Sequence, residues 1–159
     1  MTEAIKLLDI AEELVPDNAE IYYKKGNKYL LIGLYSDDKE TNFLKAISLY
    51  EKAISLNGSH EKTLNNLGWS LVKLGQLYNN DKSIDLYTKA IAELDKALVL
   101  YPNKAESYLN EGEAYLELYR LLNTPKFKNL STECFIRAND LQPGLANDLL
   151  GQLKSLPSS

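Results

Sequence analysis

The chain of 159 residues has little of the chemistry on which many enzymes and metal proteins depend, because it contains one cysteine and one histidine. Cys134 alone cannot form an intramolecular disulfide, and Cys134 with His60 cannot supply a zinc or iron–sulfur ligand set. No apolar run approaches the roughly 20 residues that a transmembrane helix needs. We therefore expect a single domain with no cofactor, no metal and no membrane-spanning segment.

Positive charge is not in excess either. The 18 Lys and Arg residues stand against 22 Asp and Glu, for a formal net charge of -4. A nucleic-acid-binding surface needs clustered basic residues, so we expect no nucleic-acid partner. The first residues, MTEAIKLLDIAEELVP, carry acids throughout and lack the basic start and apolar stretch of a signal peptide. With one cysteine, this favours a cytoplasmic location.

Small residues recur at a nearly constant period. Three glycines are separated by 42 and 44 residues, and each follows a large side chain by four residues: Tyr22–Gly26, Leu64–Gly68 and Tyr108–Gly112. Four alanines are separated by 42, 44 and 41 residues, and each precedes a leucine by three: Ala11–Leu14, Ala53–Leu56, Ala97–Leu100 and Ala138–Leu141. A period of 20 to 50 residues indicates a solenoid.

Each period divides into two helices with helical spacing of their apolar residues. The first helix of each unit (A) is predicted over 19–35, 61–78 and 105–122, and the second (B) over 38–56, 81–100 and 125–141. Glycine inside a helix costs about 1 kcal/mol relative to alanine. We therefore interpret the glycine of each A helix as a packing notch that lets an antiparallel B helix approach closely.

These residues resemble the tetratricopeptide repeat (TPR) family, whose unit is a helix–turn–helix of 34 residues. The matching positions are Tyr22, Gly26, Tyr29, Ala46, Tyr50, Ala53 and Gly58 in unit one; Leu64, Leu67, Gly68, Leu71, Ala90, Leu94, Ala97 and Pro102 in unit two; and Tyr108, Gly112, Tyr115, Phe135, Ala138 and Pro143 in unit three. The resemblance implies an all-α, right-handed superhelical solenoid of antiparallel helix pairs.

Within that architecture the predicted single domain, 1–159, divides into a lone B helix (1–16), three repeats (19–58, 61–102 and 105–143) and a C-terminal capping helix (144–156). The repeats of about 42–44 residues exceed the family length. The extra residues lie between the glycine of helix A and the first small residue of helix B, and we expect them to lengthen both helices.

The resemblance also implies that the A helices line a concave groove. Its predicted groove residues are Tyr23, Lys24, Asn27, Lys62, Asn65, Asn66, Trp69, Lys73, Asn110, Glu113 and Glu117. Asparagines in a row along the groove, Asn27, Asn66 and Asn110, would pair with a peptide backbone, or else they are surface filler. Trp69 would anchor a partner, or else it packs against the neighbouring unit.

Some TPR domains hold the carboxylate of a chaperone tail with a clamp of lysine, arginine and asparagine side chains. Asn27 and Asn66 match two of its five positions, but Tyr23, Glu106 and Asn110 stand where the basic residues belong. We therefore expect no such clamp. The lysines of the first two units and the glutamates of the third instead favour a ligand with opposite charges at its two ends.

The predicted function is a non-enzymatic protein-protein interaction module that binds a peptide or partner helix in this groove. The alternative is a structural or assembly protein that forms a homodimer through the apolar face of its N-terminal helix. No catalytic constellation supports an enzyme: His60 is interpreted as a solvated loop residue, and Cys134, beside Phe135, receives no role.

Overall fold

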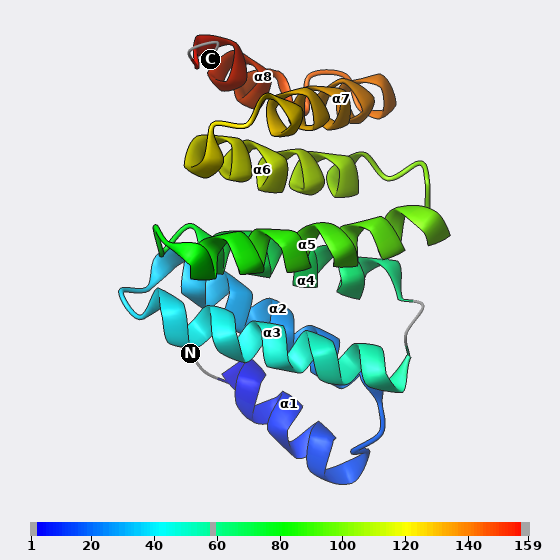
Figure 1. Cartoon of the computed structure of the whole chain (residues 1–159). Helices are drawn as coiled ribbons and strands as arrows, with labels where there is room; N and C mark the ends of the chain where they lie inside the picture. The colour runs from blue at the N-terminus through cyan, green and yellow to red at the C-terminus, as the bar shows by residue number, and fades with distance from the viewer. Residues whose placement is uncertain (1–2, 58–59, 157–159) are drawn as a thin grey trace.

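The computed structural model describes residues 3–57 and 60–156, and within them the chain forms eight helices and no strand (Figure 1). Their bounds are α1 Glu3–Leu14, α2 Ala19–Tyr35, α3 Lys39–Leu56, α4 Glu61–Gly75, α5 Asp81–Leu100, α6 Ala105–Leu122, α7 Pro125–Leu141 and α8 Asn147–Ser155. Gly58, the predicted closing residue of unit one, lies outside the described residues. The all-α prediction is confirmed for the described part of the chain.

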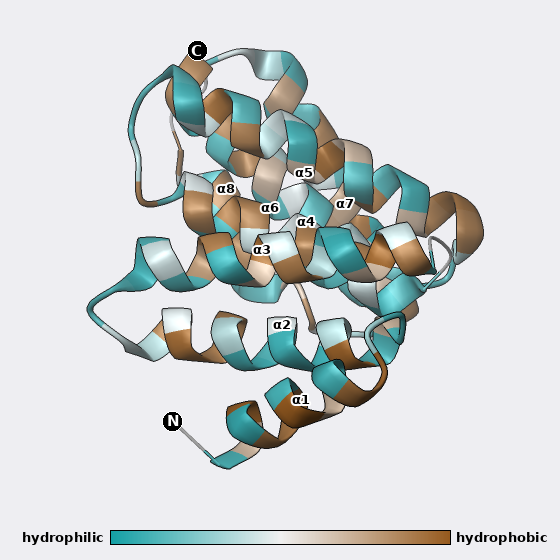
Figure 2. Cartoon of the chain, turned by 90° about the horizontal axis from the view of Figure 1, so that it is seen from below, coloured by the Kyte–Doolittle hydropathy of each residue, from teal (hydrophilic) through white to brown (hydrophobic). Residues whose placement is uncertain are grey.

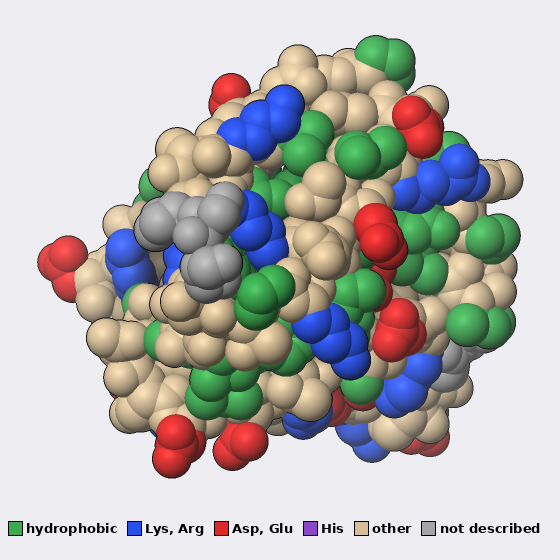
Figure 3. All heavy atoms as spheres, turned by 45° about the horizontal axis from the view of Figure 1, so that its top comes forward, with side chains coloured by type: hydrophobic (Ala, Val, Ile, Leu, Met, Phe, Trp, Pro, Cys, Tyr) green, Lys and Arg blue, Asp and Glu red, His purple; other side chains and the backbone are tan. Residues whose placement is uncertain are grey.

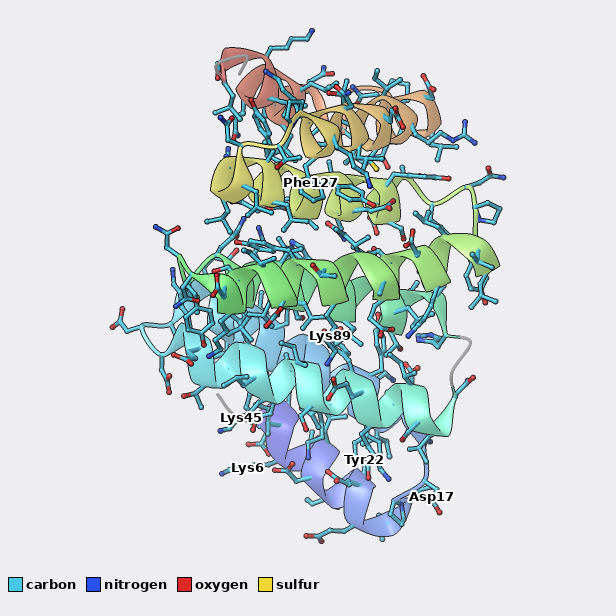
Figure 4. The ribbon with its side chains drawn as sticks, in the orientation of Figure 1. Lys6, Asp17, Tyr22, Lys45, Lys89 and Phe127 are labelled. Atoms are coloured by element: carbon cyan, nitrogen blue, oxygen red, sulfur yellow. The ribbon has the colours of Figure 1, made fainter. Side chains whose placement is uncertain are left out.

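The helices pack as three antiparallel pairs, α2–α3, α4–α5 and α6–α7, stacked between α1 at one end and α8 at the other (Figure 1). In the A-helix layer, α4 packs against both α2 and α6. In the B-helix layer, α3 and α5 are linked by an ion pair between the ends of two long side chains, Lys89 and Glu51, at 2.7 Å (Figure 4). Because neighbouring A helices pack directly against each other and, within the described residues, neighbouring B helices do not, the A helices form the inner layer of a curved stack.

The repeated glycines are packing notches, as the sequence predicts. A Cβ atom built on Gly26, Gly68 or Gly112 would lie 2.5–2.6 Å from a ring or branch carbon of the paired B helix, on Tyr50, Leu94 and Phe135 respectively. No real Cβ contact is that short. Each glycine therefore offsets its helix-propensity cost by admitting a large side chain at the centre of its helix pair.

A second notch accompanies the extra residues in the first two repeats. Gly33 and Gly75 follow the first two notch glycines by seven residues, and a Cβ on them would meet Phe43 and Tyr87 at 2.6 and 2.5 Å. Phe43 and Tyr87 in turn precede the first B-helix partners by seven residues, as antiparallel packing requires. The extra residues thus add a second close contact to each of these two helix pairs. They lie within helices, as the sequence predicts, and not in loops.

Two helix boundaries differ from the prediction by three residues, while some other described boundaries differ by one or two. Helix α4 ends at Gly75 instead of Tyr78, because the following residues turn tightly: the Leu77 amide donates to the Leu74 carbonyl and the Tyr78 amide to the Gly75 carbonyl. Helix α8 begins at Asn147 instead of residue 144. Gly144 has a left-handed φ of 88°, which interrupts the helix before it starts.

Helix α1 is attached by polar contacts. Lys25 of α2 pairs with Asp9 at 2.7 Å and also with Glu12, and the Tyr22 hydroxyl donates to the Pro16 carbonyl at 2.8 Å (Figure 4). No residue of α1 within the described part is buried. Exposed large apolar side chains nevertheless lie on this helix and directly after it: Leu7, Ile10, Leu14 and Val15. Figure 2 shows hydrophobic and hydrophilic segments alternating along the α1 ribbon.

Candidate functional site

The predicted groove residues all lie on α2, α4 and α6, the inner helices of the three pairs. They differ in how much they present to solvent. Lys24 and Lys62 are exposed, whereas Asn65 and Asn110 are buried, with 6% and 8% of their surfaces accessible. The others are half-buried: Tyr23, Asn27, Asn66, Trp69, Lys73, Glu113 and Glu117.

The asparagines join neighbouring units. The Asn66 amide nitrogen donates to Asn27 Oδ1 at 2.8 Å, and the Tyr50 hydroxyl donates to the same oxygen at 2.7 Å. One unit further on, Asn110 Nδ2 donates to Asn65 Oδ1 at 3.0 Å. Asn27 and Asn66 therefore bond to each other, whereas Asn110 bonds to the buried Asn65.

A polar network covers the C-terminal half of the A-helix face. Lys73 of α4 pairs with Glu113 of α6 at 2.6 Å, and Gln76 donates to both Glu113 and Glu117 at 3.0 and 3.1 Å. Arg120 pairs with Glu117 at 2.7 Å and reaches Gln152 of α8. Glu113 and Glu117 are thus compensated within the protein. Figure 3 shows positive and negative side chains interspersed on the face that it presents.

The N-terminal half of the same face is hollowed. A pocket of about 390 Å³ lies where α4 and α6 begin and α7 ends. Its walls include Tyr23 from α2, Lys62, Asn65 and Asn66 from α4, and Glu106 from α6. This pocket brings together four of the predicted site residues, with amide groups and opposite charges around one opening.

A second hollow, of about 530 Å³, adjoins the first at Tyr23, which lines both. His60 also lines it. The imidazole meets the Tyr23 ring edge-on, with ring centroids 4.9 Å apart, and its Nδ1 contacts the Thr63 hydroxyl. His60 is therefore half-buried in the site rather than a freely solvated loop residue, a placement that its position in a turn did not indicate.

Trp69 lies between the two halves of the face. Its indole ring is half-buried and packs against the larger apolar core, and Lys73 Nζ lies 5.7 Å from the centre of the ring. The two predicted alternatives therefore combine: one side of the ring packs inside the protein while part of the surface stays accessible.

Within residues 3–57 and 60–156, no helix is long and apolar enough to cross a membrane. In the same part of the chain, no three His, Cys, Asp or Glu side chains are grouped as a metal site would require.

No family model matches the sequence, and no curated protein does. Solved structures do. The chain is similar to the Arabidopsis OM64 TPR domain, with 23% identity and a TM-score of 0.66 over 87% of this chain and 96% of that domain. It is also similar to the first TPR domain of human RPAP3, with 18% identity and a TM-score of 0.67 over 87% and 91%.

The second TPR domain of human RPAP3, solved in complex with an HSP70 peptide, is 18% identical, with a TM-score of 0.62 over 87% of this chain and 100% of that domain. These neighbours share the helix pairs and their stacking while differing in most of their residues. The solenoid predicted from the repeats is thereby confirmed, and the chain has the TPR fold.

Proposed function

We propose that the protein is a non-enzymatic interaction module that binds an extended peptide or a partner helix at the N-terminal half of its A-helix face. The observation that carries this proposal is the open pocket between α4 and α6, beside a C-terminal half whose charges are already paired. Two TPR neighbours support it, since RPAP3 domains are solved with HSP90 and HSP70 peptides bound.

The pocket offers the groups that hold an extended chain in place. Asn66 carries an amide able to donate to and accept from peptide groups, and Tyr23 supplies an aromatic wall shared by both hollows. Lys62 and Glu106 lie on opposite helices at the rim. A ligand segment with an acidic residue toward α4 and a basic residue toward α6 therefore fits best.

The ligand differs from an acidic chaperone tail. Glu106 and the buried Asn110 occupy positions where the TPR clamp carries basic residues, so a terminal carboxylate would meet a negative charge at Glu106. Binding of such a tail with the usual preference for its free carboxylate would contradict this part of the proposal.

Replacing Trp69 with alanine is expected to weaken binding of the selected peptides about tenfold, because accessible aromatic residues near the centre of an interface dominate binding energy. The ligands are selected from a phage-displayed random dodecapeptide library, and their affinities are measured by isothermal titration. Lys62→Glu, at an exposed rim position, should weaken binding of the same peptides with no change in thermal unfolding.

Asn66→Ala, in the pocket, should lower the affinity for these peptides. Its matched control is Asn129→Ala, on the exposed surface of α7 outside the pocket, which should leave the affinity unchanged. Selected peptides that bind Trp69→Ala, Lys62→Glu and the parent protein equally would place the binding surface elsewhere.

A second candidate function, self-assembly, is favoured by the outer face of α1. Leu14 is 76% exposed and Leu7 is 59% exposed, so this helix presents apolar side chains spaced by one and two turns to solvent. A second copy of the chain would cover them in a two-fold pairing of α1 helices. The flanking Lys6 and Glu13 are both exposed and would face opposite charges in an antiparallel pair.

Under this candidate function, the 17.9 kDa chain forms a dimer whose solution mass falls to that of the monomer when Leu7 and Leu14 are both replaced by glutamate. Because α1 buries no residue, the double variant should keep its fold. Light scattering over a concentration series measures the mass. Leu122→Glu, at an apolar residue 42% exposed on α6, is the control that should leave it unchanged. A monomer at every concentration would exclude self-assembly through α1.

A further inference from the structure

Glu111 of α6 is a buried acid that the groove does not use. Only 7% of its surface is accessible, and the Cys134 thiol of α7 donates to its Oε2 at 3.6 Å. A thiol is a weak donor. Among the described residues, no ion pair involves Glu111. Buried charges in proteins are normally paired, so this carboxylate is a negative charge to which the described part of the chain brings no cation.

Glu111 lines a cavity of about 280 Å³ on the α6–α7 pair, which shares no lining residue with the two hollows of the groove. On α6 the half-buried Tyr108 and Tyr115 line it, about one helical turn before and after the acid. On α7 it is lined by Leu130 and the exposed Glu133. The cavity thus combines a buried carboxylate, a second carboxylate nearer the solvent, two aromatic rings and an aliphatic side chain.

Arg137 of α7 also lines the cavity, but it has a place of its own. Its guanidinium carbon lies 5.9 Å from the centre of the Tyr108 ring, and in the first helix pair Lys52 Nζ lies 5.8 Å from the centre of the Tyr22 ring. In sequence the two cations directly precede the repeat alanines, and the two tyrosines precede the notch glycines by four residues. A cation over this tyrosine is therefore a feature of the repeat, and it leaves Glu111 without an ion pair.

The first helix pair also shows how a charge at this position is compensated. Lys25 and Glu111 are equivalent, because each directly precedes a notch glycine, and Lys25 forms an ion pair of 2.7 Å with Asp9 of α1. Burial first, and the charge of Asp95 on α5 second, raise the pKa of Glu111 to about 7. A cation bound beside the carboxylate would stabilise its charged form.

We propose that the cavity between α6 and α7 binds an alkylammonium group, with the Glu111 carboxylate as the counter-charge and the tyrosine rings beside its alkyl chain. Tyrosine rings attract a cation that has lost its hydration, and alkyl chains of basic groups pack on apolar surface. Ammonium suits the site better than guanidinium, because a guanidinium bonds best to both carboxylate oxygens and Cys134 already donates to one of them. This site is separate from the groove and does not depend on the function proposed there.

Titration of the ¹⁵N-labelled full chain with butylammonium at pH 8 tests the proposal, and 1-butanol is the neutral probe of the same length. Butylammonium should shift the backbone amide signals of residues 108–115 and 130–137 saturably, with a dissociation constant on the order of millimolar. Equal shifts by the two probes would overturn the proposal, because they would show that the cavity does not select positive charge.

Glu111→Gln is the central variant, because glutamine keeps the shape of the side chain and removes its charge. It should bind butylammonium about thirtyfold more weakly or worse, as loss of one partner of a buried charge pair predicts. Glu51→Gln, at an exposed position of α3, also removes one negative charge and should bind as the parent protein does. In the parent protein, affinity should fall about tenfold from pH 8 to pH 6 as Glu111 takes up its proton.

Two further measurements identify what enters the cavity. Nα-acetyl-lysine N-methylamide should bind as butylammonium does if the site accepts lysine side chains of a partner, and more weakly if it accepts free amines. Arg137→Gln should bind butylammonium as the parent protein does, because the guanidinium lies over Tyr108. Much tighter binding by Arg137→Gln would show that the guanidinium fills the cavity in solution. That result, or unchanged binding by Glu111→Gln, would overturn the proposal.

Discussion

Replacing Phe135 with alanine is expected to lower the free energy of unfolding by about 3–5 kcal/mol, the range for truncating a fully buried aromatic residue. Phe135 has 0% of its surface accessible and fills the notch at Gly112. It also belongs to the core cluster that holds α8 through Leu153. Its loss therefore leaves a cavity between α6 and α7 and weakens the attachment of the last helix.

Chemical denaturation measures this effect, and the neighbouring Ile136 provides the control. Ile136 is 50% exposed on the outer side of the same helix, so Ile136→Ala should change stability by less than about 1 kcal/mol. Equal effects of the two substitutions would show that α7 does not pack on α6 in the register described.

Replacing Gly68 with alanine is expected to destabilise the protein by about 2 kcal/mol, although alanine is the better helix former by about 1 kcal/mol. The new Cβ would lie 2.5 Å from Leu94 Cγ, the branch carbon of a side chain with 0% of its surface accessible. Since a branch carbon cannot rotate away as a chain end can, the α4–α5 pair must move apart.

Gly151→Ala is the matched control. Gly151 lies inside α8 with no atom within 4 Å of an added Cβ, so alanine there should stabilise the protein by up to about 1 kcal/mol through helix propensity alone. The two glycine-to-alanine changes should thus shift the thermal unfolding midpoint in opposite directions. A gain in stability from both would mean that Gly68 is not a packing notch.

Much of the fold could be predicted because its signals are local and repeated. The periods of the glycines and alanines locate the helix pairs. Glycine is a poor helix former, so its recurrence at the same position of three helices indicates that packing requires it there. Gly33 and Gly75 carry the same signal seven residues later, so the second notch was also within reach of prediction from the residue spacing. The end of α4 was not predictable in this way, because Gln76, Leu77 and Tyr78 are compatible with a helix.

The site was less predictable because its contacts join residues about forty positions apart. Asn65 and Asn66 are neighbours in sequence with the same chemistry, yet one pairs forward to Asn110 and the other back to Asn27. Only the rotation between stacked units decides which amide is buried. The pairing of Lys73 with Glu113 depends on the same rotation, so the charges predicted along the groove overstated what a ligand would meet.

The measurement that tests the groove most directly is amide chemical-shift mapping of the ¹⁵N-labelled full chain during titration with a selected peptide. We expect the largest changes at the Trp69 indole, the Asn66 side-chain amide and the backbone of residues 61–66 and 103–106, with α8 and the outer face of α3 unaffected. Changes confined to α1, or spread along the outer helices α3, α5 and α7, would contradict binding on the A-helix face.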